Sequence, residues 1–163
     1  MEQRAVIYTK FGLFELTGSE KGIATVHRLD YEESITEDLP KVLRKCAQQL
    51  NAYFAGKRTS FDLKLDWEGA SEFNKKVWRV LLDVPYGHTI SYGQIAKLIK
   101  NPQAYQAVGL ANKHNPIAII VPCHRCIGKD GAMVGYSGGG VDIKQELLRL
   151  ENPMSFAIQG KLF

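Results

Sequence analysis

The chain has 163 residues, 45% hydrophobic and 23% charged, which excludes a mostly disordered chain, a collagen and a coiled coil. No apolar run approaches the roughly 18 residues of a membrane span, and the N-terminus lacks the apolar core of a secretory signal, so we expect no membrane segment. The net charge is −1 over residues 1–70 and +5 over residues 71–163, which favours a polyanionic partner for the second part, although solvated lysines explain it equally well.

Residues 1–70 are predicted to form an N-terminal α/β domain. Apolar residues at helical spacing predict a helix over residues 39–54, with Cys46 on its buried stripe as an inert core thiol. Residues 66–70 are the predicted linker to the next domain. Alternating or β-branched runs predict strands at residues 5–9, 13–17, 23–29 and 61–65.

Residues 71–163 are predicted to form a mostly helical domain. Ser71 can cap a first helix that ends near Leu82. Ser91 and Gln94 form a capping-box pattern that begins a short second helix. Helical spacing predicts that the inward side chains of these two helices are Phe73, Val77, Trp78, Leu81, Leu82, Ile95, Leu98 and Ile99.

A third helix follows closely, so the second and third helices resemble a helix-turn-helix. Asn101-Pro102 is predicted to end the second helix and to cap the third, which runs to about Asn112. Small residues let the backbone of the third helix approach a ligand closely, although tight helix–helix packing would need the same residues. Polar side chains on another face favour DNA as the ligand. The small residues are Ala104, Ala107, Gly109 and Ala111, and the polar ones are Gln103, Gln106 and Lys113.

The chemistry is predicted at the end of residues 117–121, an apolar run that reads as a buried strand. A cysteine followed by histidine and arginine lies in electropositive surroundings, which favour the reactive thiolate. His124 can take the proton of Cys123 directly or through a water, and the water route is favoured because adjacent side chains on extended backbone point apart.

A final helix is predicted after a cap at Asp142, and Glu151 falls on its apolar stripe. A buried carboxylate needs a partner, and a histidine is the obvious candidate. An exposed glutamate at a frayed helix end is the alternative.

The spacing Cys123-x-x-Cys126 has competing interpretations as a redox pair or half of a zinc site. Zinc needs about two more ligands, and no other pair has metal spacing, so no metal site is expected. A redox pair normally begins a helix, whereas the residues after Cys126 predict a turn. Three cysteines are an odd number and too few for a disulfide framework, so we expect a reducing, cytoplasmic setting.

These motifs together resemble the O6-alkylguanine-DNA alkyltransferases, also called methylated-DNA–protein-cysteine methyltransferases. The resemblance covers about residues 72–153, and the Pro-Cys-His-Arg block is its most specific part. The N-terminal part is similar to the family's variable domain by layout rather than by motif. The matching segments are Asn115-Pro116, Ile119–Arg125, Gly135–Gly139, Ile90–Ala96 and Ala107–Gly109, with Lys144, Leu147, Leu148 and Glu151 downstream.

The resemblance implies an α+β fold: a small antiparallel sheet with a helix, in a ribonuclease-H-like layout, and then a C-terminal DNA-binding and alkyl-acceptor domain with a helix-turn-helix. It implies a repair protein, a monomer without cofactor, that enters the minor groove of duplex DNA and flips out the damaged guanine. The alkyl group passes irreversibly to the protein's own cysteine, so each molecule acts once. Whether several molecules bind side by side on DNA stays open.

By position, the resemblance gives Cys123 the role of acceptor, with His124 and a water deprotonating it and Glu151 orienting the histidine. Asn115 would hold the local turn, and Tyr92 would protonate the departing guanine. The residues expected to contact DNA or the flipped base are Asn101, Gln106, Ala107, Gly109, Lys113, Met133, Tyr136 and Ser137.

The chain departs from the family pattern at three places. Gln106 stands where the family usually has an arginine that fills the gap left by the flipped base, which puts flipping efficiency in question. Ala118 replaces a proline of some members, so preference for bulky adducts is open. Cys126 is not a family feature.

Three alternative functions remain: a lesion-binding protein without transfer, which would lack the acceptor cysteine; a transcription regulator, which would need a further metal domain; and a redox protein.

Overall fold

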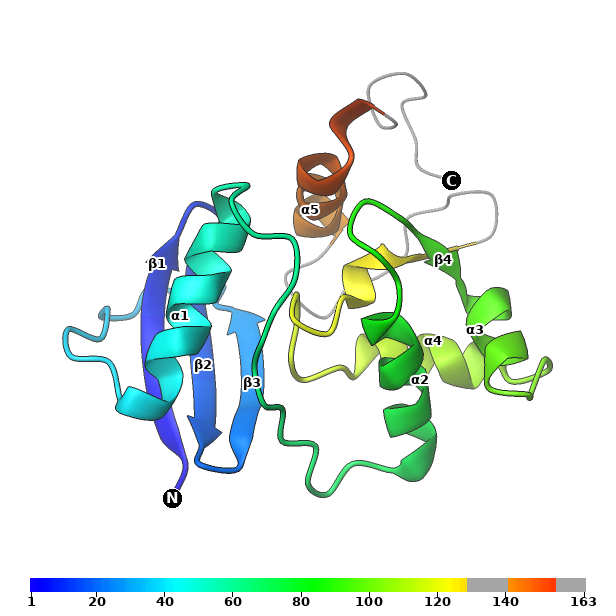
Figure 1. Ribbon diagram of the computed structural model, residues 1–163, viewed down its shortest axis with the longest axis horizontal. Helices are drawn as coiled ribbons and strands as arrows, with labels where there is room; N and C mark the ends of the chain where they lie inside the picture. Colours follow the sequence, from blue (N-terminus) through cyan, green and yellow to red (C-terminus); the bar gives the residue numbers. More distant parts are fainter. Residues whose placement is uncertain (129–140, 155–163) are drawn as a thin grey trace. The chain divides into compact units, whose positions relative to one another are not determined.

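The computed structural model describes residues 1–128 and 141–154 (Figure 1). It has two compact units, Met1–Glu68 and Gly69–Phe163. The first contains a three-stranded antiparallel sheet and one helix, and the second contains the other helices, so the predicted α+β class is confirmed. No helix in the described part of the chain is both long and apolar enough to cross a membrane.

The sheet of the first unit has the strand order β1-β2-β3, with β1 (Gln3–Thr9), β2 (Gly12–Ser19) and β3 (Gly22–Arg28) joined by short turns. Gly22 has φ +131°, and a Cβ there would lie 2.7 Å from the carbonyl oxygen of Lys64, so only glycine fits this turn. Helix α1 (Lys41–Phe54) packs on the sheet (Figure 1). The fully buried side chains between them are Phe14, Leu16, Val26, Leu43, Leu50, Tyr53 and Phe54.

Cys46 lies in this core as predicted. Its side chain is fully buried, and burial raises the pKa of its thiol to about 12, so it stays an inert neutral group.

The predicted strand at residues 61–65 does not form. Only Leu65 makes a bridge, parallel to Ile23. The side chain of Gln49 binds both the backbone N–H and the carbonyl of Asp62, at 2.9 and 3.2 Å, so these groups are not available to a strand ladder.

The second unit begins with α2 (Glu72–Leu82) and α3 (Tyr92–Leu98), and both predicted caps are confirmed. Ser71 accepts a hydrogen bond from the Asn74 N–H, and Ser91 and Gln94 form the complete capping box. The inward faces are mostly as predicted, but two leucines differ: Leu82 is 42% and Leu98 is 63% exposed.

Helix α4 (Tyr105–Lys113) begins later than predicted, with Ala104 rather than Asn101 at its N-cap. The reason is the turn that ends α3: Lys100 has φ +62°, and the N–H of Asn101 donates to the carbonyl of Ala96. Asn101 therefore completes the end of α3 and cannot cap the next helix. The indole N–H of Trp78 donates to the Ala111 carbonyl at 2.9 Å and ties α2 to α4.

Residues 117–121 are buried as predicted but are not a strand. Ile119 has φ +74°, and the N–H of Val121 donates to the carbonyl of Ile117, so the segment is a tight loop. The cause is Asn115, whose side chain accepts from the Ile117 N–H and donates to the Val121 carbonyl. The second unit also contains a short parallel pair of strands that the sequence did not predict. These strands are β4 (Ile90–Ser91) and β5 (Cys126–Ile127). Helix α5 (Val141–Glu151) is the predicted final helix, but Asp142 lies within its first turn and is not its cap.

Candidate active site

Cys123 begins a 3-10 turn, η1 (Cys123–Arg125), instead of ending a strand. Its side chain is fully buried, and the Asn115 amide donates to the sulfur at 3.1 Å. The same amide donates to the Val121 carbonyl at 2.9 Å, so one side chain both shapes the loop and contacts the sulfur. Because a donor aimed at sulfur favours the charged form, Asn115 stabilises a Cys123 thiolate.

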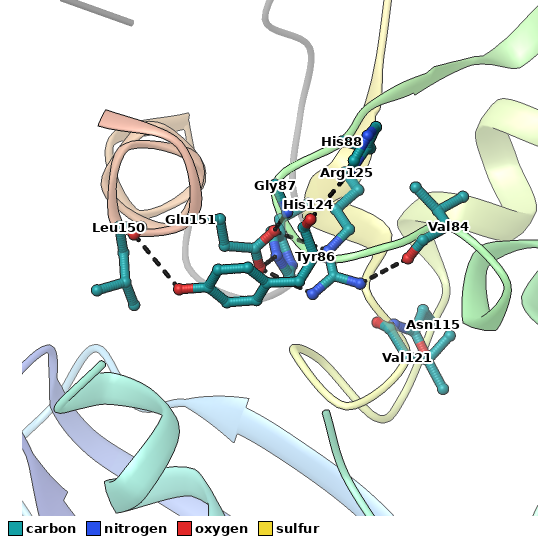
Figure 2. Close-up of polar contacts among 10 residues, drawn as sticks. All are labelled: Val84, Tyr86, Gly87, His88, Asn115, Val121, His124, Arg125, Leu150 and Glu151. Atoms are coloured by element: carbon teal, nitrogen blue, oxygen red, sulfur yellow. Dashed lines mark hydrogen bonds and ion pairs between the residues drawn. The ribbon is translucent and has the colours of Figure 1, made fainter. Parts of the chain in front are cut away.

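His124 and Glu151 lie together, as the sequence predicted. The His124 Nε2 is 2.6 Å from the Glu151 Oε2, and both side chains are buried (Figure 2). Burial lowers the pKa of His124 even though the carboxylate raises it, so the imidazole is neutral near pH 7. An ionised carboxylate only accepts hydrogen bonds, so Nε2 carries the proton and Nδ1 carries the lone pair of a base.

Arg125 is the second partner of Glu151, whereas the sequence indicated only that its charge lies near the cysteine. Its Nε donates to Oε1 at 2.8 Å and its Nη2 to Oε2 at 3.0 Å, a two-pronged ion pair within the protein interior. Its Nη1 donates to the Val84 carbonyl at 2.7 Å. Burial alone would raise the pKa of Glu151, but His124 and Arg125 outweigh burial and hold that pKa well below its usual range. Glu151 is therefore a fixed negative charge beside His124.

The loop between α2 and β4 packs against the end of α5. The N–H of Gly87 donates to Glu151 Oε1 at 3.1 Å, and the hydroxyl of Tyr86 donates to the Leu150 carbonyl at 3.4 Å (Figure 2). The side-chain amide of Asn152 donates a hydrogen bond to the Gly87 carbonyl. No local sequence signal links this loop to α5, because the residues are more than 60 positions apart.

Tyr92 lies at the start of α3, half-buried, beside the two site cysteines. Burial, followed by the proximity of Cys126 and Cys123, raises the pKa of Tyr92 to about 12. The phenol is therefore a proton donor at neutral pH and not a base.

Two further buried polar side chains support the site and were not assigned to it from sequence. The ammonium of Lys144 donates to the Cys126 carbonyl at 2.6 Å, and burial lowers the pKa of this lysine. The Asn112 amide donates to the Cys123 carbonyl at 3.3 Å and so connects the end of α4 to the cysteine. Lys144 was recognised only as a position that matches the family, and no local pattern singled out Asn112.

Cys126 is fully buried, and burial raises its thiol pKa above the usual range, so this thiol stays neutral near pH 7. All three cysteines are free thiols. Within residues 1–128 and 141–154, no group of three or more His, Cys, Asp and Glu side chains is arranged to hold a metal ion.

Five of the residues expected to contact DNA lie on the helix-turn-helix, and most of them are at the surface. Asn101, Gln106, Ala107 and Lys113 are exposed. A Cβ on Gly109 would meet no described atom within 4 Å, so helix–helix packing does not require its small size. Tyr105 and Leu110 are more than half exposed on the same helix. The expected base-reading residues Met133, Tyr136 and Ser137 lie outside the described residues.

Comparisons with known proteins agree with this geometry over both units. A family model described as "6-O-methylguanine DNA methyltransferase, DNA binding domain" matches residues 72–153, and one described as "6-O-methylguanine DNA methyltransferase, ribonuclease-like domain" matches residues 4–67. The methylated-DNA--protein-cysteine methyltransferase of Mycolicibacterium paratuberculosis is 48% identical over 155 residues, 93% of each chain. The protein of that name from Methanosarcina barkeri is 48% identical over 90% of this chain and 94% of its own.

Solved structures show the same similarity. Mycobacterium tuberculosis O6-methylguanine methyltransferase superposes with a TM-score of 0.82 at 44% identity, covering 94% of each chain. The crystal structure of Mycobacterium tuberculosis OGT in complex with DNA superposes with a TM-score of 0.80 at 47% identity, covering 91% of this chain and 92% of that one.

Proposed function

The chain belongs to the 6-O-methylguanine DNA methyltransferase family, and from this premise we propose that it repairs DNA by moving the alkyl group of O6-alkylguanine onto its own Cys123. One observation carries the assignment of the acceptor: the Cys123 sulfur accepts from Asn115, and its neighbour His124 is hydrogen-bonded to the buried carboxylate of Glu151.

The reaction is a single displacement at carbon. The Nδ1 lone pair of His124 accepts the Cys123 proton through a water molecule, and the Glu151 carboxylate offsets the positive charge that the imidazole gains. The thiolate then attacks the alkyl carbon, a carbon–sulfur bond forms, and the bond from that carbon to O6 breaks. Guanine leaves with the electron pair, and Tyr92 protonates it. Among the described residues, none at the site is placed to cleave the resulting thioether, so we expect each molecule to act once; by family resemblance, no cofactor takes part.

Arg125 and Gly87 are positioning residues in this scheme. Both bind the carboxylate of Glu151, so the charge beside His124 stays in place while the imidazole gains and loses a proton. A carboxylate fixed in advance needs no rearrangement as charge develops.

The DNA partner is a duplex that carries an O6-alkylguanine, and α4 is proposed to enter its minor groove. The small residues Ala107, which is exposed, and Gly109, which is half-buried, permit close approach of the helix backbone, and Gln106 reaches into the space of the flipped guanine. Asn101 and Lys113 flank this face and contact the backbone. By family resemblance, Met133, Tyr136 and Ser137 read the flipped base. The protein acts as a monomer in the reducing cytoplasm, where Cys123 stays a thiol.

A stoichiometry experiment tests the proposal. A duplex with one O6-methylguanine is mixed with a deficit of protein, and the restored guanine is counted. We expect at most one repaired lesion per protein molecule, and none with Cys123→Ala, although this variant still binds the duplex. Repair beyond one equivalent, or repair by Cys123→Ala, contradicts the proposal.

A further inference from the structure

A positively charged hollow lies on the second unit, outside the cysteine site. It has a volume of roughly 320 Å³ and lies between α2 and the end of α3. We call it the cationic hollow. The residues that line it are Lys76, Arg79, Leu98, Ile99 and Lys100, so it has three cations and no acidic side chain.

Within the described part of the chain, the two lysines of the cationic hollow have no counter-ion. Across residues 1–128 and 141–154, neither Lys76 nor Lys100 forms an ion pair, whereas the adjacent Lys75 pairs with Glu72 at 3.3 Å. Lys76 and Lys100 are like charges on one hollow and repel one another, and an anion bound there relieves the repulsion.

Lys100 occupies a backbone position that favours glycine. It has φ +62°, its N–H donates to the Lys97 carbonyl at 3.0 Å, and the Asn101 N–H donates to the Ala96 carbonyl at 2.9 Å. These two bonds define a Schellman motif, in which the left-handed residue is usually glycine. A lysine there is strained, and retained strain points to a use for the side chain.

The cationic hollow adjoins the proposed DNA-binding face. Lys100 lies in the turn between α3 and α4, and α2 packs against both helices (Figure 1). Leu98 is 63% exposed although helical spacing predicts it to be inward, so an apolar surface lies beside the cations. Phosphates beside apolar deoxyribose match this combination of charge and aliphatic surface, and the DNA backbone presents them in a row.

We propose that Lys76, Arg79 and Lys100 bind the sugar-phosphate backbone of the duplex and extend the DNA contact from α4 onto α2. The inference rests on the proposed function, since it takes duplex DNA as the ligand. These contacts carry no sequence information; they add affinity and fix the orientation of the helix-turn-helix on the duplex.

The test measures affinity for an undamaged duplex over a range of salt concentrations. The variants are Lys76→Gln, Arg79→Gln and Lys100→Gly, alone and combined, with Lys57→Gln on the first unit as the matched control. Each lost phosphate contact lowers the slope of log K against log salt by about 0.9. We expect a weaker affinity and a lower slope for each variant of the cationic hollow and no change for the control.

Lys100→Gly separates charge from folding, because glycine relieves the strained backbone. We expect its melting temperature to rise while its affinity for DNA falls. Affinity and slope equal to those of the wild type in the combined variant would overturn the proposal and leave the proposed function intact. Alkyl transfer by the wild type from free O6-benzylguanine is measured in parallel, and its absence together with absent duplex binding would instead reject the proposed function.

Discussion

Glu151 accepts hydrogen bonds from His124, Arg125 and Gly87. Its negative charge is the counter-ion of Arg125 and offsets the charge that His124 gains. Glu151→Gln leaves the Arg125 guanidinium buried without a counter-ion, which costs about 3–5 kcal/mol of the free energy of unfolding. It also removes the charge that offsets the imidazolium of His124, so alkyl transfer slows. Urea unfolding and single-turnover repair rates measure the two effects.

The matched control is Glu146→Gln on the same helix. Glu146 pairs with Arg149 at 2.9 Å, but both side chains are about half exposed, so the loss is below about 1 kcal/mol. A folded Glu151→Gln protein that repairs DNA at the wild-type rate would show that the carboxylate plays no part in the chemistry.

The pH dependence of stability follows from the same group of residues. The pKa of His124 is lowered from 6.5 in the folded protein. Below about that pH the unfolded chain binds a proton at His124 and the folded protein does not, so acidification favours unfolding. The pKa of Glu151 is lowered from 4.5, which adds a second loss as the pH falls below that value. Stability is therefore full at neutral pH and falls on acidification, first below about 6.5. Urea midpoints measured between about pH 8 and about pH 4 that stay level or rise would contradict this assignment.

Helix α4 contains Gly109, whose small size is not required for packing against the described residues. Gly109→Ala has open space for the added methyl, so we expect helix α4 to gain about 0.5–1 kcal/mol. If the backbone of α4 lies close to DNA, the same methyl weakens duplex binding. Melting temperature and duplex affinity should therefore change in opposite senses, and a gain in both would place Gly109 away from DNA.

Gln106 is exposed on the same helix, where the family usually has an arginine. Gln106→Arg should speed repair in duplex DNA more than reaction with free O6-alkylguanine, because only the duplex requires a flipped base. Equal effects on both substrates would separate Gln106 from flipping.

The sequence predicted those elements whose causes lie within a few residues of one another. The capping box of α3 joins residues three positions apart, Ser91 and Gln94, and was predictable. The failed strands at residues 61–65 and 117–121 were decided by the side chains of Gln49 and Asn115, which bind backbone groups that a strand ladder would use. The spacing of apolar residues predicts that such segments are buried. It does not predict which groups their backbone N–H and C=O groups bind.

The candidate site divides in the same way. His124 next to Cys123 follows from the sequence motif, and a glutamate on an apolar stripe indicated the need for a buried partner. The sequence did not reveal Arg125 and Gly87 as partners of Glu151, because that arrangement requires three distant segments to meet.

For the whole molecule, the buried acceptor predicts a change in stability after the reaction. Cys123 is fully buried, and its sulfur accepts from Asn115. An added methyl overfills this site and weakens that contact, so the alkylated protein should lose about 1–3 kcal/mol of unfolding free energy. Melting curves before and after reaction measure the loss, and an unchanged melting temperature would mean that the site accommodates the methyl freely.

Mass spectrometry identifies the residue that accepts the alkyl group. The protein is reacted with a duplex containing one O6-methylguanine, and its intact mass and its peptides are measured beside those of Cys123→Ala. We predict one added methyl group, in the wild type only, on the peptide that holds Cys123 and on that sulfur. A methyl group on Cys126 or Cys46, or one gained by Cys123→Ala, would rule out Cys123 as the acceptor.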